Sequence, residues 1–281
     1  MDHVNGNTAE EVAAQYPDKP EGVPTEHREK FSRQMAQIMI KLASIRMPAI
    51  GSIIRDPADP SLFDVGPLTE TGSGPYESAA ELYADYPLAL HRKLANGGEP
   101  VEWQRELVES FRSLAASFPH PATGTVDANL AGGFGLANFD LNPNNVLVDH
   151  DYNVLAVIDW DAVAAVPDAA LYRIPALMGL SCAVPGIVDE DAAEKARQLR
   201  AREFAAVVEA MGREMKSKGG EGVNERQICL RTKSGFPSKQ AVAFRSLTFV
   251  KMEQDFVNRS WIKGLEWLSE HDEAAVARFY F

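Results

Sequence analysis

The sequence predicts a mixed α+β protein that is mainly helical and contains one short β-hairpin. Helices are indicated by apolar residues that recur every three or four positions in several long segments. The hairpin is indicated by two apolar runs, 146–148 and 154–158, which flank a stretch of turn-forming residues. With 281 residues, of which 45% are hydrophobic and 24% charged, the chain is typical of globular proteins and can bury a large core.

The first quarter of the chain predicts a loop, a helix and a second loop. Residues 7–24 are polar and contain several prolines, which favours a loop. Thr25 is expected to cap a helix that ends near Pro48. The apolar face of this helix is formed by Phe31, Met35, Ile38, Leu42 and Ile45. Residues 48–76 hold many Pro, Gly and Asp residues and predict an extended, loop-rich excursion.

Further helices are predicted on both sides of the hairpin. Ser78 and Glu81 have the spacing of a capping box and begin a helix that Pro87 is expected to kink or shorten. The next helix has an apolar face formed by Trp103, Leu107, Phe111 and Leu114. Helices are also predicted over 190–217 and from Ser238 to the end of the sequence. We assign these apolar faces to the core.

The centre of the chain carries the residues with catalytic potential. Asn145 directly precedes the first run of the hairpin, Asp159 directly follows the second, and Asp140 lies five residues before Asn145. In phosphoryl transfer an Asp accepts the proton of the attacking hydroxyl, while an Asn and a second Asp bind magnesium. Antiparallel pairing would bring Asn145 and Asp159 together as oxygen ligands for Mg²⁺. The alternative is that they bond to the backbone, as we expect for Asp149 and Asp151 in the hairpin turn.

On these residues the chain resembles the aminoglycoside phosphotransferase and choline kinase family, in the form common in fungal genomes. That family shows His-Gly-Asp-Leu-x-x-x-Asn-Ile-Leu-Val-Asp, then a turn, then Ile-Asp-Trp-Glu. The matching segments here are 140–141, 145–149 and 158–161. The resemblance implies a protein-kinase-like carboxyl-terminal lobe, with Asp140 as general base. It also implies that Asn145 and Asp159 hold Mg²⁺, with ATP as donor and a small-molecule hydroxyl as acceptor.

The chain departs from the family pattern in two respects. Asn138 and Phe139 stand where the family has His and Gly, and that His normally supports the catalytic loop. The family's amino-terminal lobe, with its glycine-rich turn, strand lysine and helix glutamate, is not visible upstream of the motif. Residues 1–6 resemble the hinge that joins the two lobes, Met-Glu-Tyr-Val-x-Gly. We therefore expect a hinge remnant at 1–6, a polar loop at 7–24 and a kinase-like carboxyl-terminal lobe at 25–281, with the amino-terminal lobe absent. In the hinge, Asp2, His3 and Val4 are the expected adenine contacts.

No other segment supplies a phosphate-binding loop. The pattern Gly-x-x-x-x-Gly-Lys-Ser/Thr is absent from the sequence. Residues 132–135 are interpreted as a tight turn, and Lys251 as a surface residue of a helix. Residues 72–74 predict a compact loop, and a place over the substrate is the functional alternative for it.

Composition restricts the possible partners. The net charge of −12 disfavours nucleic acid and anionic membranes, and no run of eighteen apolar residues predicts a membrane span. An acidic surface would favour cationic acceptors such as an amino sugar or amino alcohol, although solubility alone is a sufficient explanation. The polar N-terminus and the two cysteines, Cys182 and Cys229, favour a reducing cytoplasm.

These observations predict an ATP- and Mg²⁺-dependent small-molecule phosphotransferase. The chain by itself is expected to be inactive or weak, because phosphates on an open, wet surface gain little electrostatic stabilisation. The alternative is a non-catalytic kinase-like scaffold that binds a protein partner or a second copy through the face of the missing lobe. A third, more remote hypothesis is a magnesium-dependent hydrolase that uses the same carboxylates.

Overall fold

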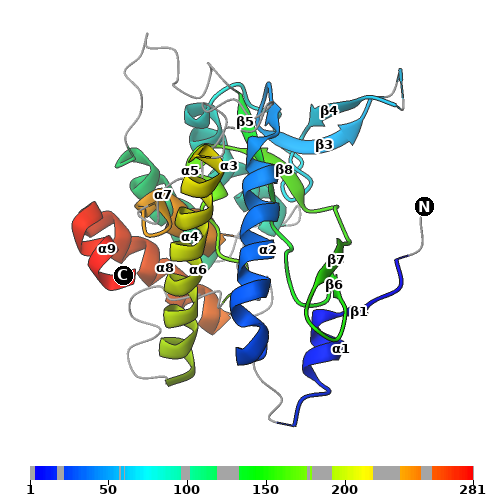
Figure 1. Ribbon diagram of the computed structural model, residues 1–281. Coiled ribbons are helices and arrows are strands. Elements are labelled where there is room, and N and C mark those ends of the chain that lie inside the picture. The colour runs from blue at the N-terminus through cyan, green and yellow to red at the C-terminus, as the bar shows by residue number, and fades with distance from the viewer. Residues whose placement is uncertain are drawn as a thin grey trace.

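The computed structural model describes residues 4–17, 22–56, 58–59, 61–95, 102–118, 133–175, 178, 192–217, 235–247 and 255–280. Two small antiparallel sheets lie on one side of the molecule and most helices on the other (Figure 1). The predicted mixed α+β class is therefore confirmed. Among the described helices, none combines the length and the apolar character needed to cross a membrane.

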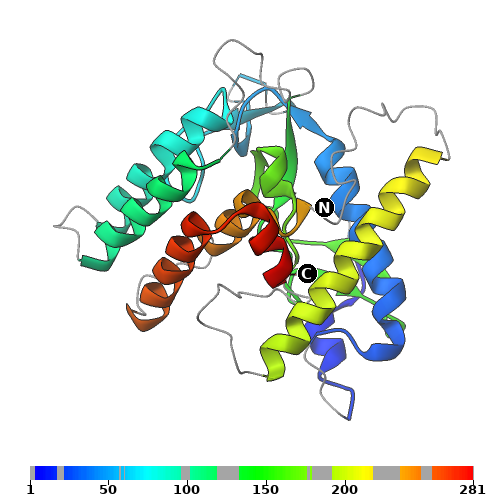
Figure 2. The same cartoon turned by 90° about the vertical axis from the view of Figure 1, so that its left-hand side faces the viewer.

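The helices fall mainly in the predicted segments. They are α1 (Ala9–Ala13), α2 (Thr25–Ser44), α3 (Ala79–Ala95), α4 (Glu102–Ala116), α5 (Asp168–Leu171), α6 (Ala192–Ser217), α7 (Lys239–Leu247), α8 (Asp255–Glu270) and α9 (Glu273–Tyr280). Helix α4 packs between α3 and α8, and α2 packs on α6, as Figure 2 shows. Helix α3 continues beyond Pro87 to Ala95 rather than ending there.

The described strands form a three-stranded and a five-stranded sheet. They are β1 (Asn7–Thr8), β2 (Arg46–Met47), β3 (Gly51–Arg55), β4 (Phe63–Gly66), β5 (Phe134–Asn138), β6 (Val146–Val148), β7 (Val154–Val157) and β8 (Val163–Val166). The smaller sheet has the order β1-β6-β7, and the larger has the order β2-β5-β8-β3-β4. The larger sheet joins β5 and β8, which lie on the two sides of the predicted hairpin in sequence. Pairing between distant segments therefore positions the loop that carries Asp140.

The prediction of a loop over residues 7–24 is wrong at its beginning. Residues 7–8 pair with β6, and α1 follows directly. A capping box begins this helix: Thr8 Oγ1 accepts the N–H of Glu11 at 3.2 Å, and Glu11 Oε2 accepts the N–H of Thr8 at 2.8 Å. The Thr-x-x-Glu spacing that signals this box is present in the sequence.

Three further local predictions need correction. The loop-rich excursion contains the β3–β4 hairpin, where a Cβ at Gly51 would lie 2.0 Å from the backbone oxygen of Gly66. In the segment predicted as a tight turn, Gly133 has φ +71° and the chain then enters β5. Thr25 is the first residue of α2 rather than its cap, because Pro24 precedes it without a side-chain cap. Pairing with β8 outweighs the weak strand propensity of Gly135 in β5.

The predicted apolar faces form much of the core. Phe31 and Met35 of α2 are fully buried, and Phe134 of β5 lies in the same cluster. The predicted face of α4 is also buried: Trp103, Leu107, Phe111 and Leu114. By contrast Ile45, at the end of the predicted stripe of α2, is exposed because the helix has ended at Ser44. The core thus holds α2 against β5, the strand that leads into the loop carrying Asp140.

Candidate functional site

The predicted hairpin is present and joins two candidate magnesium ligands. Strands β6 and β7 are antiparallel, with Val146 opposite Val157. One step further, the N–H of Ile158 donates to the backbone oxygen of Asn145 at 2.9 Å. Asp159 is the next residue, so strand pairing brings the ends that carry Asn145 and Asp159 together. This is the arrangement that the spacing predicted.

The turn of this hairpin uses its acidic side chain for structure. The Asp149 carboxylate accepts the side-chain amide of Asn153 at 2.7 Å and its backbone N–H at 2.8 Å. It also accepts the N–H of Asp151 at 3.0 Å. The bonds from Asn153 are the main cause of the lowered pKa of Asp149. The turn-forming role expected for Asp149 is confirmed.

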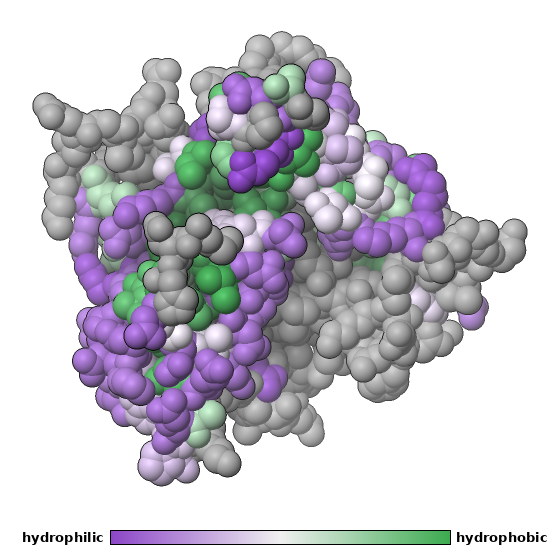
Figure 3. All heavy atoms as spheres, turned by 90° about the vertical axis from the view of Figure 1, so that its right-hand side faces the viewer, coloured by the Kyte–Doolittle hydropathy of each residue, from purple (hydrophilic) through white to green (hydrophobic). Residues whose placement is uncertain are grey.

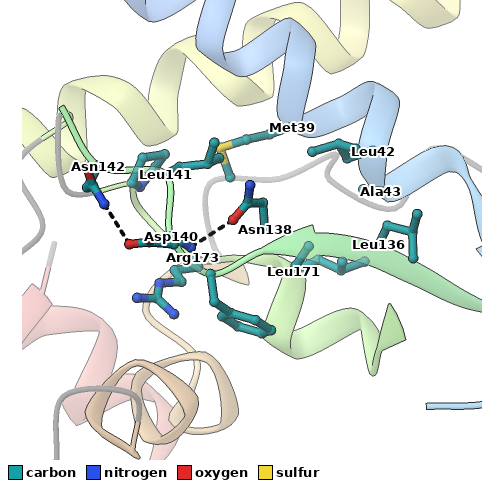
Figure 4. A pocket seen from close by; sticks show the side chains of 13 residues that line it. Met39, Leu42, Ala43, Leu136, Asn138, Asp140, Leu141, Asn142, Leu171 and Arg173 are labelled. Carbon is teal, nitrogen blue, oxygen red and sulfur yellow. Dashed lines mark hydrogen bonds between the residues drawn. The ribbon is translucent and has the colours of Figure 1, made fainter. Parts of the chain in front are cut away.

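Asp140 is held by neighbouring amides on both of its carboxylate oxygens. Asn142 Nδ2 donates to Oδ1 at 2.6 Å, and Asn145 Nδ2 donates to Oδ2 at 2.7 Å. The backbone N–H of Asp140 in turn donates to Oδ1 of Asn138 at 2.8 Å, as Figure 4 shows. Each carboxylate oxygen keeps a further lone pair, so Asp140 is oriented and still able to accept a proton.

Asn145 is oriented so that its amide oxygen is available. The side chain is 8% exposed, and its Nδ2 donates to Oδ2 and to the backbone oxygen of Asp140, the latter at 3.0 Å. Among the residues that the structure describes, none donates a hydrogen bond to Oδ1 of Asn145. An amide oxygen of this kind is a hard ligand suited to Mg²⁺.

Asp159 has an unusual backbone conformation. Its φ is +57°, in the left-handed region that Asp tolerates better than most residues. Its Oδ1 is 3.5 Å from the N–H of Asp161, and its backbone oxygen is 3.5 Å from Nδ2 of Asn138. Such conformations cluster at functional sites, where the surrounding structure maintains them.

Asp140 and Asp159 line one pocket of about 510 Å³. Other polar residues on its wall are Ser52, Thr69, Glu70, Lys93, Asp161 and Arg173. Asn145 is not part of the lining and is linked to it through its bonds to Asp140. A second pocket of about 150 Å³ lies beside the same loop and is lined by Asn138, Asp140 and several apolar residues of α2 and β5 (Figure 4).

Several wall residues were not found by sequence reasoning. The loop after β4 reaches the pocket through residues 68–70, next to the residues 72–74 for which a place over the substrate was considered. Glu70 is held there by α3: the hydroxyl of Tyr86 donates to its Oε2 at 2.8 Å, and the ammonium of Lys93 donates to its backbone oxygen. Neither Lys93 nor Arg173 belongs to a local motif, so only the fold identifies them.

The predicted hinge contacts are only partly described. Asp2 and His3 lie outside the described residues, as do Lys251, Cys182 and Cys229. Val4 is exposed. Two residues later, a Cβ at Gly6 would lie 2.8 Å from Leu155 Cδ1 and 3.3 Å from the backbone oxygen of Val148. The segment that follows Val4 therefore runs closely against the hairpin.

In the part of the chain that the structure describes, no group of three or more His, Cys, Asp or Glu residues is arranged to hold a metal. A metal here would therefore rely on Asp159 and the Asn145 amide, and Mg²⁺ commonly uses such small protein ligand sets completed by water and phosphate. Comparison with protein-family models, with curated proteins and with solved structures gave no significant match.

Proposed function

We propose that this chain is a phosphotransferase-like protein of the small-molecule kinase type, built on a kinase-like carboxyl-terminal lobe. The observation that supports this most directly is the shared pocket of Asp140 and Asp159, with Asn145 bonded to the Asp140 carboxylate. In this proposal Asp140 is the general base, and Asn145 and Asp159 are the Mg²⁺ ligands. Val4 and its neighbours Asp2 and His3 remain the proposed adenine contacts.

The chain's own residues have distinct roles in this chemistry. Asp140 accepts the proton of the acceptor hydroxyl. Asn142 and Asn145 each donate to one of its carboxylate oxygens and so fix the orientation of the carboxylate. Asn145 and Asp159 present oxygens to Mg²⁺, which when bound neutralises phosphate charge. The Asn138 side chain contacts the backbones of both Asp140 and Asp159 and so holds the two residues near each other.

The pocket is of a size that fits a small-molecule acceptor. Its volume of about 510 Å³ lies in the usual range for such sites. The net charge of −12 supports a cationic acceptor, such as an amino sugar or amino alcohol. Neither nucleic acid nor an anionic membrane suits this charge, and the two cysteines support a cytoplasmic location.

We propose weak or no turnover by residues 1–281 alone. Lys93, which lines the pocket, comes from helix α3 rather than from a strand over the phosphates. Electrostatic stabilisation of a transferring phosphoryl group loses most of its strength in contact with water. Binding is therefore a better first test than turnover.

The test measures Mg²⁺-dependent ATP binding by calorimetry. Asp159→Asn is expected to weaken that binding by about tenfold or more, because a charged metal ligand is lost. The matched control is Asp151→Asn, which removes the same charge from the exposed turn at the other end of the hairpin. Equal affinity of wild type and Asp159→Asn, or absence of ATP binding in both, would reject the proposal.

A scaffold without catalysis is the second candidate. Leu155, Ile158 and Trp160 are 42%, 40% and 47% exposed although they are large and apolar. On the face shown in Figure 3, hydrophobic surface gathers in two areas that hydrophilic residues border. Such surface favours a protein partner or self-association. Light scattering that gives a monomer mass over a wide concentration range would exclude the self-associating form.

A further inference from the structure

Arg173 lies at the junction of the two pockets around the catalytic loop. It follows α5 closely and lines both the 510 Å³ and the 150 Å³ pocket, each time together with Asp140. Its neighbours in sequence, Leu171 and Ile174, are buried and anchor the backbone. Figure 4 shows the guanidinium beside the Asp140 loop. The fold therefore directs a cation toward the place where the acceptor hydroxyl would react.

An aromatic ring holds this arginine in position. The guanidinium carbon of Arg173 is 5.1 Å from the centroid of the Phe139 ring, a cation–π distance. Phe139 directly precedes Asp140, and its N–H donates to the backbone oxygen of Ala162 at 3.1 Å. The replacement of the motif glycine by Phe139 thus has a structural consequence: it couples the arginine to the catalytic loop.

Charged side chains of both signs lie on the wall of the larger pocket. Four carboxylates line the larger pocket, from Glu70, Asp140, Asp159 and Asp161, and two cations face them, Lys93 and Arg173. A guanidinium binds phosphate oxygens with two parallel hydrogen bonds, which an ammonium cannot do. Arg173 is therefore the better suited of the two for a phosphate-type anion.

We propose that Arg173 binds the phosphoryl oxyanion in this pocket, whose wall also carries Asp159, the proposed magnesium ligand. This inference rests on the proposed phosphotransferase function and adds a residue to it. An arginine in this place stabilises the charge on the equatorial oxygens of the transferring group. Phe139 is the residue that positions it.

Calorimetry with inorganic phosphate and MgCl₂, in the presence and absence of ADP, tests the assignment. Arg173→Gln is expected to weaken phosphate binding by about tenfold, and Arg173→Lys by less, since a lysine keeps the charge but not the paired bonds. The affinity for MgADP is expected to change by less than about twofold, because phosphate is the only ligand assigned to Arg173. Arg112→Gln on α4 is the control, since it removes an exposed arginine paired with Glu109.

The outcomes separate this inference from the proposed function. If wild type binds MgADP but phosphate affinity is the same in Arg173→Gln, the arginine assignment is wrong and the phosphotransferase proposal stands. If MgADP does not bind while phosphate binds and depends on Arg173, the proposed function fails and the anion site stands. Absence of phosphate binding by wild type overturns the inference.

A measurement on the unchanged protein covers the case in which the variants do not fold. Phenylglyoxal modifies accessible arginines, and peptide mass analysis shows which ones react. Phosphate with MgCl₂ is expected to protect Arg173 and to leave Arg112 reactive. Equal modification of Arg173 with and without phosphate would contradict the proposal.

Discussion

The side-chain oxygen of Asn138 accepts the backbone N–H of Asp140 at 2.8 Å. The amide nitrogen of the same side chain lies 3.5 Å from the backbone oxygen of Asp159. Asn138 is buried at the end of β5, so one amide contacts both the proposed base and a proposed metal ligand. Asn138 thus ties the loop that carries Asp140 to the residue that follows the hairpin.

Removal of this amide should destabilise the protein and loosen the loop. Asn138→Ala leaves the partly buried N–H of Asp140 without its acceptor, which costs about 1 kcal/mol of unfolding free energy. Urea unfolding measures this loss. The control is Asn144→Ala, an exposed residue of the same loop, for which we expect a change within about 0.5 kcal/mol. Equal stabilities of the two variants would contradict the role of Asn138.

The protein should lose stability at alkaline pH because Tyr152 is buried. Burial raises the pKa of Tyr152 from 10.0 to about 12. The unfolded chain releases this proton first, so stability falls as pH rises from about 10 toward about 12, by up to about 1.4 kcal/mol per pH unit. In Tyr152→Phe this contribution disappears and the decline with pH should be shallower.

The same substitution has a separate effect at neutral pH. The hydroxyl of Tyr152 donates to the backbone oxygen of Ala9 in α1 at 3.1 Å. Tyr152→Phe should therefore cost about 1 kcal/mol at pH 7. Urea unfolding from neutral to alkaline pH measures both effects. An unchanged slope with pH would show that Tyr152 does not titrate with a raised pKa.

Helix α3 should stabilise the loop over residues 66–76, which forms part of the wall of the 510 Å³ pocket. The Tyr86 hydroxyl holds the Glu70 carboxylate at 2.8 Å, and burial is the main cause of the raised pKa of this tyrosine. Tyr86→Phe removes that bond, so amide hydrogen exchange over residues 66–76 should become about tenfold faster. Arg112→Gln, which removes an exposed side chain of the neighbouring helix α4, should leave it unchanged. Equal exchange in both variants would argue against this anchor.

Two arginine ion pairs should differ in their effect on stability. Arg46 Nη1 is 2.7 Å from Oδ1 of Asp168 and 3.2 Å from the backbone oxygen of Gly133, and its side chain is 11% exposed. Arg46→Met should cost about 2–4 kcal/mol, because two partners lose a largely buried cation. Arg33→Met breaks the exposed pair with Glu214 and should cost less than about 1 kcal/mol. Similar losses in thermal unfolding would contradict this difference.

Features that depend on neighbours in sequence were predictable. Two apolar runs around a turn-forming stretch indicated the hairpin, and Asp149 behaves as a turn residue. Apolar periodicity identified the buried faces of α2 and α4. Even the missed helix α1 has a local signal, since Thr8 and Glu11 stand at capping-box spacing.

Features that depend on pairing between distant segments could not be predicted from the sequence. Residues 132–135 look like a turn in sequence because three of them are glycines, yet the last two begin β5 since β8 supplies the partner. Likewise β3 and β4 lie in a Pro- and Gly-rich stretch; they pair with each other, and β3 also pairs with β8. Strand propensity is weak there, so the decisive free energy comes from pairing and burial.

The sequence by itself determined that Asp140, Asn145 and Asp159, the residues of the proposed site, lie close together, because a loop and a hairpin of fixed spacing join them. Only the tertiary structure decided which cations and acids face them. Lys93 and Arg173 reach the pocket from helix α3 and from the segment after α5. Their positions follow from how the sheet and the helices pack, and packing between distant segments leaves no pattern in the local sequence.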